Sequence, residues 1–518
     1  MDSVASMRTV VVTGEPLTVD DVVDVARGRA RAVLGPDVAS RMAASHRVVA
    51  AAVERDEVVY GVTTGFGALA DTSVGREALD LMQLALVRSH AAAVGDPLPD
   101  EHVRALLLLR ARTLAAGYSG VRVDLPQRLL ELLERGLLPV VPERGSVGAS
   151  GDLAQLAHLA LPLVGEGRLR DEGSADLTGR PATELLDETG LAPLTLGPKE
   201  GLALLNGTEP MQALLALSVA DAELLVRVAD VACAMSVECL LGTDRPYDER
   251  VQTLRPHPGQ LASAANLRAL LAGSPLLASH RDSRHAVQDA YCLRCAPQVH
   301  GAVRDVLAHV RRVLEIELGA VVDNPVVIDD DVLTSGNFHG EPLAFAADML
   351  AIALAELASI AERRVDRMLD PAFSRGLPPF LAPDAGANSG YMLAQYTAAA
   401  IVSEHKVLTH PASVDTIPTS GNQEDHVSMG WGAVRKLRDV VAGVRSVLAV
   451  ELICAAQGID LRADVAAPGA VTAAVHGRLR DAIPRMDTDR EVGSQITTAD
   501  RLLVELVDAA ESVSGPLR

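Results

Sequence analysis

Aromatic residues are scarce in this chain of 518 residues. Phe, Trp and Tyr make up only 2% of the sequence, although 48% of its residues are hydrophobic. The core must therefore be built mainly from Leu, Val and Ala, and that mixture favours helices over sheets. The mean hydropathy of +0.20 is high for a soluble monomer, so we expect large buried interfaces between helices or between subunits.

Cysteine is also rare, with five residues in the chain. So few thiols in a long chain are typical of a reducing cytoplasm. Cys292 and Cys295 have the C-x-x-C spacing of zinc and redox sites, but a second such pair is absent and Arg294 lies between the two thiols. We therefore expect neither a metal site nor a redox role for this pair.

Signals for secretion, membranes and nucleic acids are missing as well. Residues 1–6 lack the basic and apolar regions of a signal peptide. No run of about 18 apolar residues is free of charge, so we expect no transmembrane helix. The formal net charge of −21 argues against nucleic acid and anionic membranes as partners. The composition therefore favours a cytoplasmic protein without such partners.

Residues 145–153, Gly-Ser-Val-Gly-Ala-Ser-Gly-Asp-Leu, contain too much glycine for a regular element. In a tightly bent backbone, the amide nitrogen of Gly151 can attack the carbonyl carbon of Ala149. Loss of water from the ring, and of the Ser150 hydroxyl, leaves a 4-methylidene-imidazol-5-one, an electrophile of the kind that cofactors usually supply. The glycines permit the strained dihedrals that cyclisation needs.

A simpler explanation of the same stretch is a Gly/Ser loop that leads into a helix, with Asp152 as its N-cap. The two interpretations are compatible. A helix that begins directly after the ring directs its positive end toward it and makes the electrophile stronger.

Helical periodicity dominates the rest of the N-terminal half. A capping-box pattern at Thr18 predicts a helix that continues to Leu34, where Gly35 and Pro36 end it. A second helix is predicted through Val53, and further helices around residues 78–90, 101–116 and 127–137. Residues 60–67 break the periodicity with three glycines, and residues 165–197 are turn-rich, with short hairpins expected.

Long helices are predicted from residue 199 onward. Pro342 stands in a first helical turn, where its missing N–H costs nothing, and apolar residues keep to one face as far as Leu369. Similar patterns cover residues 210–241, 299–318, 389–408 and 433–457. We therefore predict a mainly α-helical fold with only short β-hairpins. Residues 1–206 would form an N-terminal domain that carries the 60–67 and 145–153 loops, and residues 207–518 a long-helix bundle with a C-terminal helical region.

Five further polar islands interrupt the helices, at residues 88–90, 205–208, 288–294, 336–340 and 421–426. Each has a simpler explanation alone: a single His on a helix is usually structural, Asn-Gly is usually a turn, and Asn-Gln-Glu-Asp-His is usually a solvated cap. The H-E-x-x-H motif is absent, and the three aspartates at 329–331 predict a solvated turn, since the EF-hand spacing is missing. We therefore expect no bound metal.

Together, these islands resemble the motifs of one family, the histidine ammonia-lyases within the aromatic amino acid ammonia-lyases and 2,3-aminomutases. Residues 145–153 look like that family's cyclising loop and residues 60–67 like its tyrosine loop. The other islands follow in the family's order, and the resemblance extends from Leu17 to about Gly458. It implies a central bundle of long helices and a homotetramer in which each active site is built from three subunits.

The resemblance also implies which residues carry out catalysis. Ala149, Ser150 and Gly151 would form the methylidene-imidazolone, so that no external cofactor is needed. Tyr60 would remove the β-proton of the substrate, and its pKa, ordinarily near 10, must be shifted or the phenol transiently ionised. Tyr291 would hydrogen-bond the substrate or the imidazolone.

The remaining matched residues are implied to bind the substrate. Arg294 would hold its carboxylate as a bidentate pair, and two polar groups would recognise a polar imidazole better than a phenyl ring. The implied binding set is Ser89, His90, Asn206, Gln288, Arg294, Phe338 and Glu424. The chain departs from the family's common pattern at Gln155, Glu209 and His405.

The implied reaction is elimination of ammonia from L-histidine to give urocanate. In the favoured family mechanism, the substrate's amine adds to the methylidene carbon derived from Ser150, and attack by the substrate's ring is the older alternative. A tyrosine or phenylalanine ammonia-lyase and an aromatic 2,3-aminomutase are alternatives on the same scaffold. A non-catalytic helical scaffold with an uncyclised loop is an alternative of another class.

Overall fold

The computed structural model describes residues 7–69, 75, 78–283 and 287–518. The chain divides into two compact units, each drawn from segments that are far apart in the sequence. Unit 1 comprises Met1–Ala220, Arg311–Ala347 and Pro411–Arg435, and unit 2 comprises Asp221–Val310, Asp348–His410 and Lys436–Arg518. Because each unit combines several segments, this division does not decide whether the chain has a domain boundary at residue 206. That boundary stays a prediction.

Unit 1 opens with strand β1 (Arg8–Val12), helix α1 (Val19–Ala26) and strand β2 (Ala30–Leu34). The predicted capping box is present, because Thr18 Oγ1 accepts the backbone N–H of Asp21 at 3.0 Å and the Asp21 carboxylate accepts that of Thr18 at 3.0 Å. The predicted continuation of this helix to Leu34 is wrong, since β2 pairs in parallel with β1. Strand pairing is a long-range interaction that overrides local helical preference.

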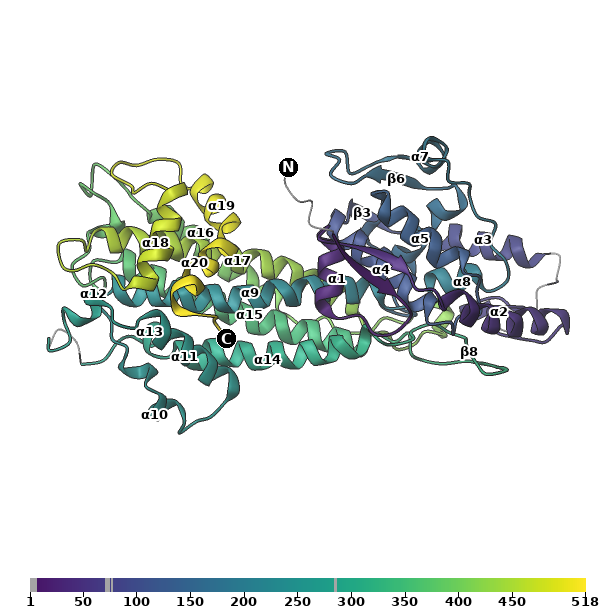
Figure 1. Cartoon of the computed structure of the whole chain (residues 1–518), viewed down its shortest axis with the longest axis horizontal. Coiled ribbons are helices and arrows are strands. Elements are labelled where there is room, and N and C mark those ends of the chain that lie inside the picture. Colours follow the sequence, from purple (N-terminus) through teal and green to yellow (C-terminus); the bar gives the residue numbers. More distant parts are fainter. Residues whose placement is uncertain (1–6, 70–74, 76–77, 284–286) are drawn as a thin grey trace. The chain divides into compact units, whose positions relative to one another are not determined.

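The core of unit 1 is helical. α4 (Asp100–Ala115) packs against α1 and against α5 (Asp124–Glu134) (Figure 1). Its residues from 102 to 115 are all buried, as expected of a helix surrounded on every side. α2 (Val38–Glu54) matches the second predicted helix. Three more helices, α3 (Leu79–His90), α6 (Leu153–Ala160) and α8 (Glu200–Leu205), pack against one another and carry much of the candidate site.

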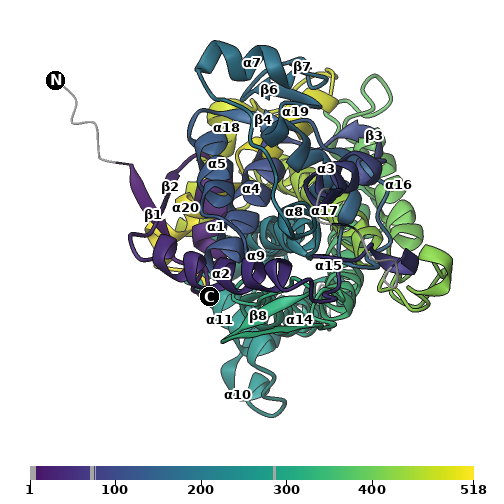
Figure 2. The same cartoon turned by 90° about the vertical axis from the view of Figure 1, so that its right-hand side faces the viewer.

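The sheets of unit 1 are small. β4 (Leu137–Pro139), β6 (Arg168–Asp171) and β7 (Arg180–Pro181) form an antiparallel sheet, followed by α7 (Ala182–Thr189), which the sequence analysis does not predict (Figure 2). This arrangement confirms a hairpin within residues 165–197. β3 (Val94–Pro97) pairs with β5 (Pro142–Arg144), and β8 (Val326–Ile328) pairs with β9 (Asp331–Leu333). The turn between β8 and β9 holds Asp329 and Asp330, as predicted, whereas Asp331 already belongs to β9.

The long helices predicted after residue 199 are all present. They are α9 (Glu209–Cys239), α14 (Ala296–Glu317), α15 (Glu341–Leu369), α16 (Met392–Leu408) and α17 (Gly430–Asp460). Unit 2 also contains α10 (Glu249–Gln252), α11 (Pro258–Leu270), α12 (Pro275–Ala278), α13 (Tyr291–Arg294), α18 (Ala470–Ala482), α19 (Gly493–Arg501) and α20 (Leu503–Ser514). The fold is mainly α-helical with short strands, which confirms the predicted fold class.

α15 is a core helix. Among the residues that the structure describes, it is the one helix long and apolar enough to cross a membrane. In its most apolar stretch of 18 residues, 56% is buried inside the protein. It also carries Arg364, whose Nη2 lies 2.8 Å from Oε2 of Glu451 on α17, with both side chains fully buried. A buried, paired charge of this kind belongs to a protein interior.

Candidate functional site

The loop at residues 145–151 is sharply bent. Gly148 and Gly151 have φ angles of 69° and 74°, in the left-handed region that favours glycine. Ala149 and Gly151 face each other as bridge partners across Ser150, and Gly151 also forms a bridge with Gly207. A Cβ atom at position 151 would lie 1.9 Å from the carbonyl oxygen of Gly207. Only glycine fits there, so the tripeptide is held in a tight bend by a close backbone contact.

Asp152 fixes this loop to the start of α9. Its carboxylate accepts hydrogen bonds from Ser146 Oγ at 2.6 Å and from the backbone N–H of Met211 at 3.1 Å. Its own N–H donates to the carbonyl oxygen of Gly207 at 3.0 Å. Asp152 is the N-cap residue of α6, as predicted, but its side chain makes no capping hydrogen bond, because the carboxylate accepts from these two donors instead. Burial raises the pKa of Asp152 to about 7.

Asn206 contacts Ser150 directly. Its side-chain Nδ2 donates to the backbone carbonyl oxygen of Ser150 at 3.2 Å and also to the Ser150 hydroxyl. Its Oδ1 is buried and has no hydrogen-bond partner, which is unusual in a folded protein. An acceptor of this kind, next to the Ala149–Gly151 tripeptide, is available to a further donor group.

A buried ion pair supports the backbone of Asn206. Arg110 Nη1 donates to the carbonyl oxygen of Asn206 at 3.0 Å and to Oε1 of Glu209 at 2.7 Å. Both charged side chains are completely buried. Glu209, one of the departures from the family pattern, therefore balances the charge of Arg110 directly behind the loop.

A cavity of about 510 Å³ opens beside Ser150 in unit 1. It brings together Tyr60, Ser89, His90, Ser150 and Glu424, which come from four separate sequence motifs. The other lining residues are Gly65, Phe66, Gly67, Ala68, Leu69, Met82, Ala85, Leu86, Leu153, Leu202, Leu205 and Ser420. The cavity is therefore mostly apolar with a few convergent polar groups, as is usual for small-molecule sites.

Tyr60 is a neutral phenol in this arrangement. Its hydroxyl oxygen accepts the backbone N–H of Gly67 at 3.3 Å. Burial raises the pKa of Tyr60, the Gly67 hydrogen bond opposes that rise, and the negative charge of Glu424 adds to it. A nearby cation or dipole is needed before this phenol can ionise easily.

Gln83, which is not among the predicted site residues, positions the tyrosine loop. This fully buried side chain donates from Nε2 to the carbonyl oxygen of Gly61 at 3.4 Å and accepts the N–H of Leu202 at Oε1 at 3.1 Å. It thereby joins the loop after Tyr60 to α8. The available signal was a polar residue among the apolar positions of α3. The apolar lining residues give no signal, because such side chains in a helix are indistinguishable from core.

His90 and Glu424 are two of the polar residues that line the cavity. His90 Nδ1 lies 2.9 Å from the carbonyl oxygen of Leu86. A carbonyl can only accept, so Nδ1 carries the hydrogen and Nε2 is left as an acceptor. Burial lowers the pKa of His90 and so favours this neutral form. Oε2 of Glu424 accepts a hydrogen bond from Thr419 Oγ1 at 2.8 Å, and Ser89 lies beside His90 with its Oγ 3.1 Å from Nδ1.

Seven predicted site residues do not line this cavity. Ala149 and Gly151 flank Ser150 in the bent loop and Asn206 contacts it, and the other four are Gln288, Tyr291, Arg294 and Phe338. Gln288, Tyr291 and Arg294 belong to unit 2, where they form a cluster of their own. The Arg294 guanidinium lies 4.8 Å from the centre of the Tyr291 ring and donates a hydrogen bond to Gln288 Oε1. Tyr291 is 72% exposed. Phe338 is half-buried in the loop before α15.

The chain is similar to known proteins over most of its length. The family described as "Aromatic amino acid lyase" matches residues 17–481. A histidine ammonia-lyase from Anaeromyxobacter sp. (strain K) is 52% identical over 505 residues, covering 96% of this chain and 99% of the relative.

Two solved structures superpose on nearly the whole chain. A histidine ammonia-lyase from Trypanosoma cruzi is 40% identical with a TM-score of 0.89, covering 98% of this chain and 96% of the other. A tyrosine aminomutase from Streptomyces globisporus is 36% identical with a TM-score of 0.92, covering 98% and 100%. The similarity therefore includes both units.

Proposed function

The chain belongs to the aromatic amino acid lyase family, and from that premise we propose that it eliminates ammonia from L-histidine to give urocanate. Relatives that match it over nearly their full length at about half identity carry the name histidine ammonia-lyase. The observation that carries the proposal is the cavity that unites Ser150 with Tyr60, His90 and Glu424.

The loop fits a methylidene-imidazolone formed from Ala149, Ser150 and Gly151. The tripeptide is bent at Ser150, and the buried Asn206 side chain contacts it. Oδ1 of Asn206 has no hydrogen-bond partner and can accept a hydrogen bond from the ring or the substrate. α6 begins two residues after Gly151, so its positive end lies next to the loop. When formed, the group supplies an electrophilic alkene that makes the substrate's amine a better leaving group.

Tyr60 is the proposed base for the β-proton of the substrate. Its hydroxyl lines the cavity, and the Gly67 N–H at 3.3 Å stabilises the phenolate. Because burial and Glu424 raise the pKa of Tyr60, ionisation requires added positive potential. The substrate's ammonium group and the guanidinium of Arg294 are the proposed sources.

His90 and Glu424 are the proposed readers of the imidazole. Neutral His90 offers Nε2 as an acceptor for the imidazole N–H, and the Glu424 carboxylate accepts from the ammonium group, or from the second ring N–H when the substrate's imidazole is protonated. A phenyl ring leaves Nε2 of His90 without a partner, and an unpaired buried group rejects such an analogue strongly.

The proposed assembly is a homotetramer with active sites shared between three subunits. The cluster of exposed Gln288 and Tyr291 with half-buried Arg294 is our candidate for a contribution from a second subunit, where Arg294 would bind the substrate's carboxylate. Phe338 would pack beside the ring. All five cysteines are free thiols, which supports a reducing cytoplasmic location.

One experiment tests the reaction and its alternatives. Purified full-length protein is incubated without added cofactor with L-histidine, L-tyrosine or L-phenylalanine, and ultraviolet absorption and mass spectrometry identify the products. We expect a conjugated product from L-histidine and no β-amino acid. A β-amino acid would support the aminomutase alternative, for which the similarity to a tyrosine aminomutase is the specific observation. An intact mass that is not two waters below the sequence mass would support the uncyclised scaffold.

A further inference from the structure

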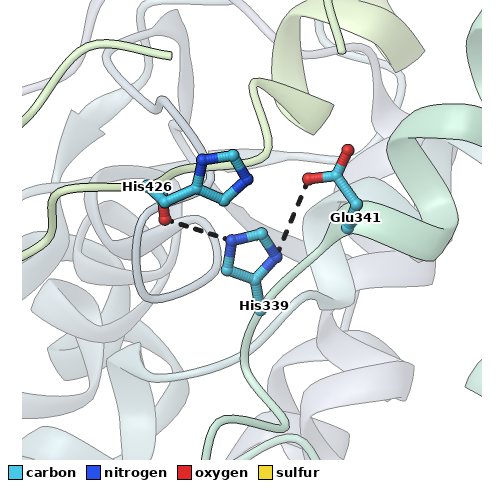
Figure 3. A group of neighbouring side chains, drawn as sticks. All are labelled: His339, Glu341 and His426. Carbon is cyan, nitrogen blue, oxygen red and sulfur yellow. Dashed lines mark hydrogen bonds and ion pairs between the residues drawn. The ribbon is translucent and has the colours of Figure 1, made fainter. Parts of the chain in front are cut away.

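Two histidines and a glutamate meet outside the cavity. His339 precedes α15, Glu341 is its first residue, and His426 lies in the 411–435 segment of the same unit. The ligand-type atoms of the three side chains all lie within 4.8 Å of one another (Figure 3). The two imidazole rings are stacked, with centres 5.8 Å apart and an interplanar angle of 7°.

The hydrogen bonding of His339 orients one nitrogen toward the carboxylate. Its Nε2 lies 3.1 Å from the backbone carbonyl oxygen of His426. A carbonyl only accepts, so Nε2 carries a hydrogen, and in the neutral ring Nδ1 has a free lone pair. That Nδ1 lies 3.9 Å from Oε2 of Glu341 (Figure 3). A lone pair and a carboxylate repel each other unless a cation, either a proton or a metal ion, lies between them.

We propose that His339, Glu341 and His426 bind a divalent transition-metal ion of the zinc class. Two imidazoles and one carboxylate suit Zn²⁺, whereas Mg²⁺ and Ca²⁺ prefer oxygen ligands. Histidine ligands characteristically donate their second N–H to a backbone carbonyl, as His339 does here.

Binding requires one imidazole to rotate, because the lone pairs of two nearly parallel rings lie in parallel planes and do not meet at one point. The distances between the ligand atoms require smaller changes. Ligands about 2.1 Å from a tetrahedral ion lie roughly 3.4 Å from one another. The present separations of up to 4.8 Å close with side-chain shifts of about 1 Å, since His426 is exposed and the other two side chains are only half-buried. The open side leaves room for water as a further ligand, and the net charge of −21 attracts cations to the protein.

The ion would tie the start of α15 to the segment that carries Glu424, two residues before His426. It would therefore act as a positioning site for the substrate-binding carboxylate, and this consequence alone rests on the proposed function. The binding of the metal does not.

Metal binding is tested on the tag-free, full-length protein after treatment with a chelator. Co²⁺ is titrated and followed by its visible absorption, and Zn²⁺ by calorimetry. We expect one ion per chain and no thiolate-to-metal charge-transfer band. His339→Gln, Glu341→Gln and His426→Gln should each weaken binding by about tenfold or more. His257→Gln, which changes another exposed histidine, and Cys295→Ser should leave the affinity unchanged.

A second measurement uses the wild-type chain, in case a variant fails to fold. Zn²⁺ should protect His339 and His426, and not His257, from acylation by diethyl pyrocarbonate, as read by peptide mass spectrometry. Absence of saturable binding, unchanged affinity in all three variants, or absence of protection would overturn the metal site and leave a histidine–carboxylate ion pair. Because none of these readouts uses turnover, they stand apart from the test of the lyase reaction.

Discussion

The side-chain amide of Asn206 donates a hydrogen bond to the backbone carbonyl oxygen of Ser150 at 3.2 Å. The two residues are held in register because Gly151 and Gly207, their neighbours, are in direct backbone contact. The Asn206-Gly207 turn therefore holds the Ala149–Gly151 loop in its bent conformation, through one side-chain hydrogen bond and one backbone contact.

Ser150→Ala should abolish turnover while the fold and assembly stay intact. Without the hydroxyl, no exocyclic alkene can form, and the residual rate should be at least about 10³-fold lower. Turnover of L-histidine, intact mass and size-exclusion chromatography check this. Ser512→Ala, at an exposed position of α20, is the matched control. Activity near that of the control would refute the assigned role of Ser150.

Tyr60→Phe should lower kcat by about 10³-fold, the usual contribution of a positioned general base. The hydroxyl accepts one hydrogen bond from Gly67, so its loss should cost only about 1 kcal/mol of folding free energy. Steady-state kinetics and thermal melting separate the two effects. Tyr118→Phe changes a tyrosine that does not line the cavity and that is 44% exposed, and it should behave as wild type. A mild effect at Tyr60 would assign the base elsewhere.

His90→Leu should lower kcat/KM for L-histidine by about 10²-fold and raise the relative rate with L-phenylalanine. The change removes the Nε2 acceptor and leaves an apolar wall against the ring. The ratio of the two kcat/KM values is the measurement, so that any general loss of activity cancels. An unchanged ratio would show that substrate choice lies elsewhere.

Asp152→Asn should flatten the dependence of stability on pH. The pKa of Asp152 is raised to about 7 by burial, from an ordinary 3.8. The folded protein then binds this proton more tightly than the unfolded chain does. Its contribution to stability is present below about pH 4 and is lost as the pH rises through about 7, a change of about 4 kcal/mol.

The asparagine variant cannot ionise and should lack that loss. Thermal melting of both proteins between about pH 5 and pH 8 gives the difference in free energy of unfolding at each pH. We expect the gap between them to change with pH in favour of the variant at the alkaline end. Parallel profiles would mean that Asp152 titrates at its ordinary pKa.

Local sequence signals predicted α15 at both ends, because Pro342 marks its first turn and Asp370-Pro371 its end. They failed for residues 30–34, whose strand exists through pairing with β1, and for the Asp152 side chain, whose donors are Ser146 in the same loop and Met211 on α9. The motifs around Tyr60, Ser150 and His90 contribute residues to one cavity, while their catalytic roles stay predictions. The histidine and glutamate cluster gave no signal, since His339 and His426 are far apart in the sequence.

The bend at residues 149–151 is held from outside, by the backbone of Gly207 and through Asp152 by Met211. A nascent chain that has not yet emerged past these residues has nothing to hold the loop closed. Cyclisation of the tripeptide, as proposed, would therefore have to follow the folding of these segments, and a misfolded copy would keep an unmodified serine. The electrophile would then form only in chains that have already folded.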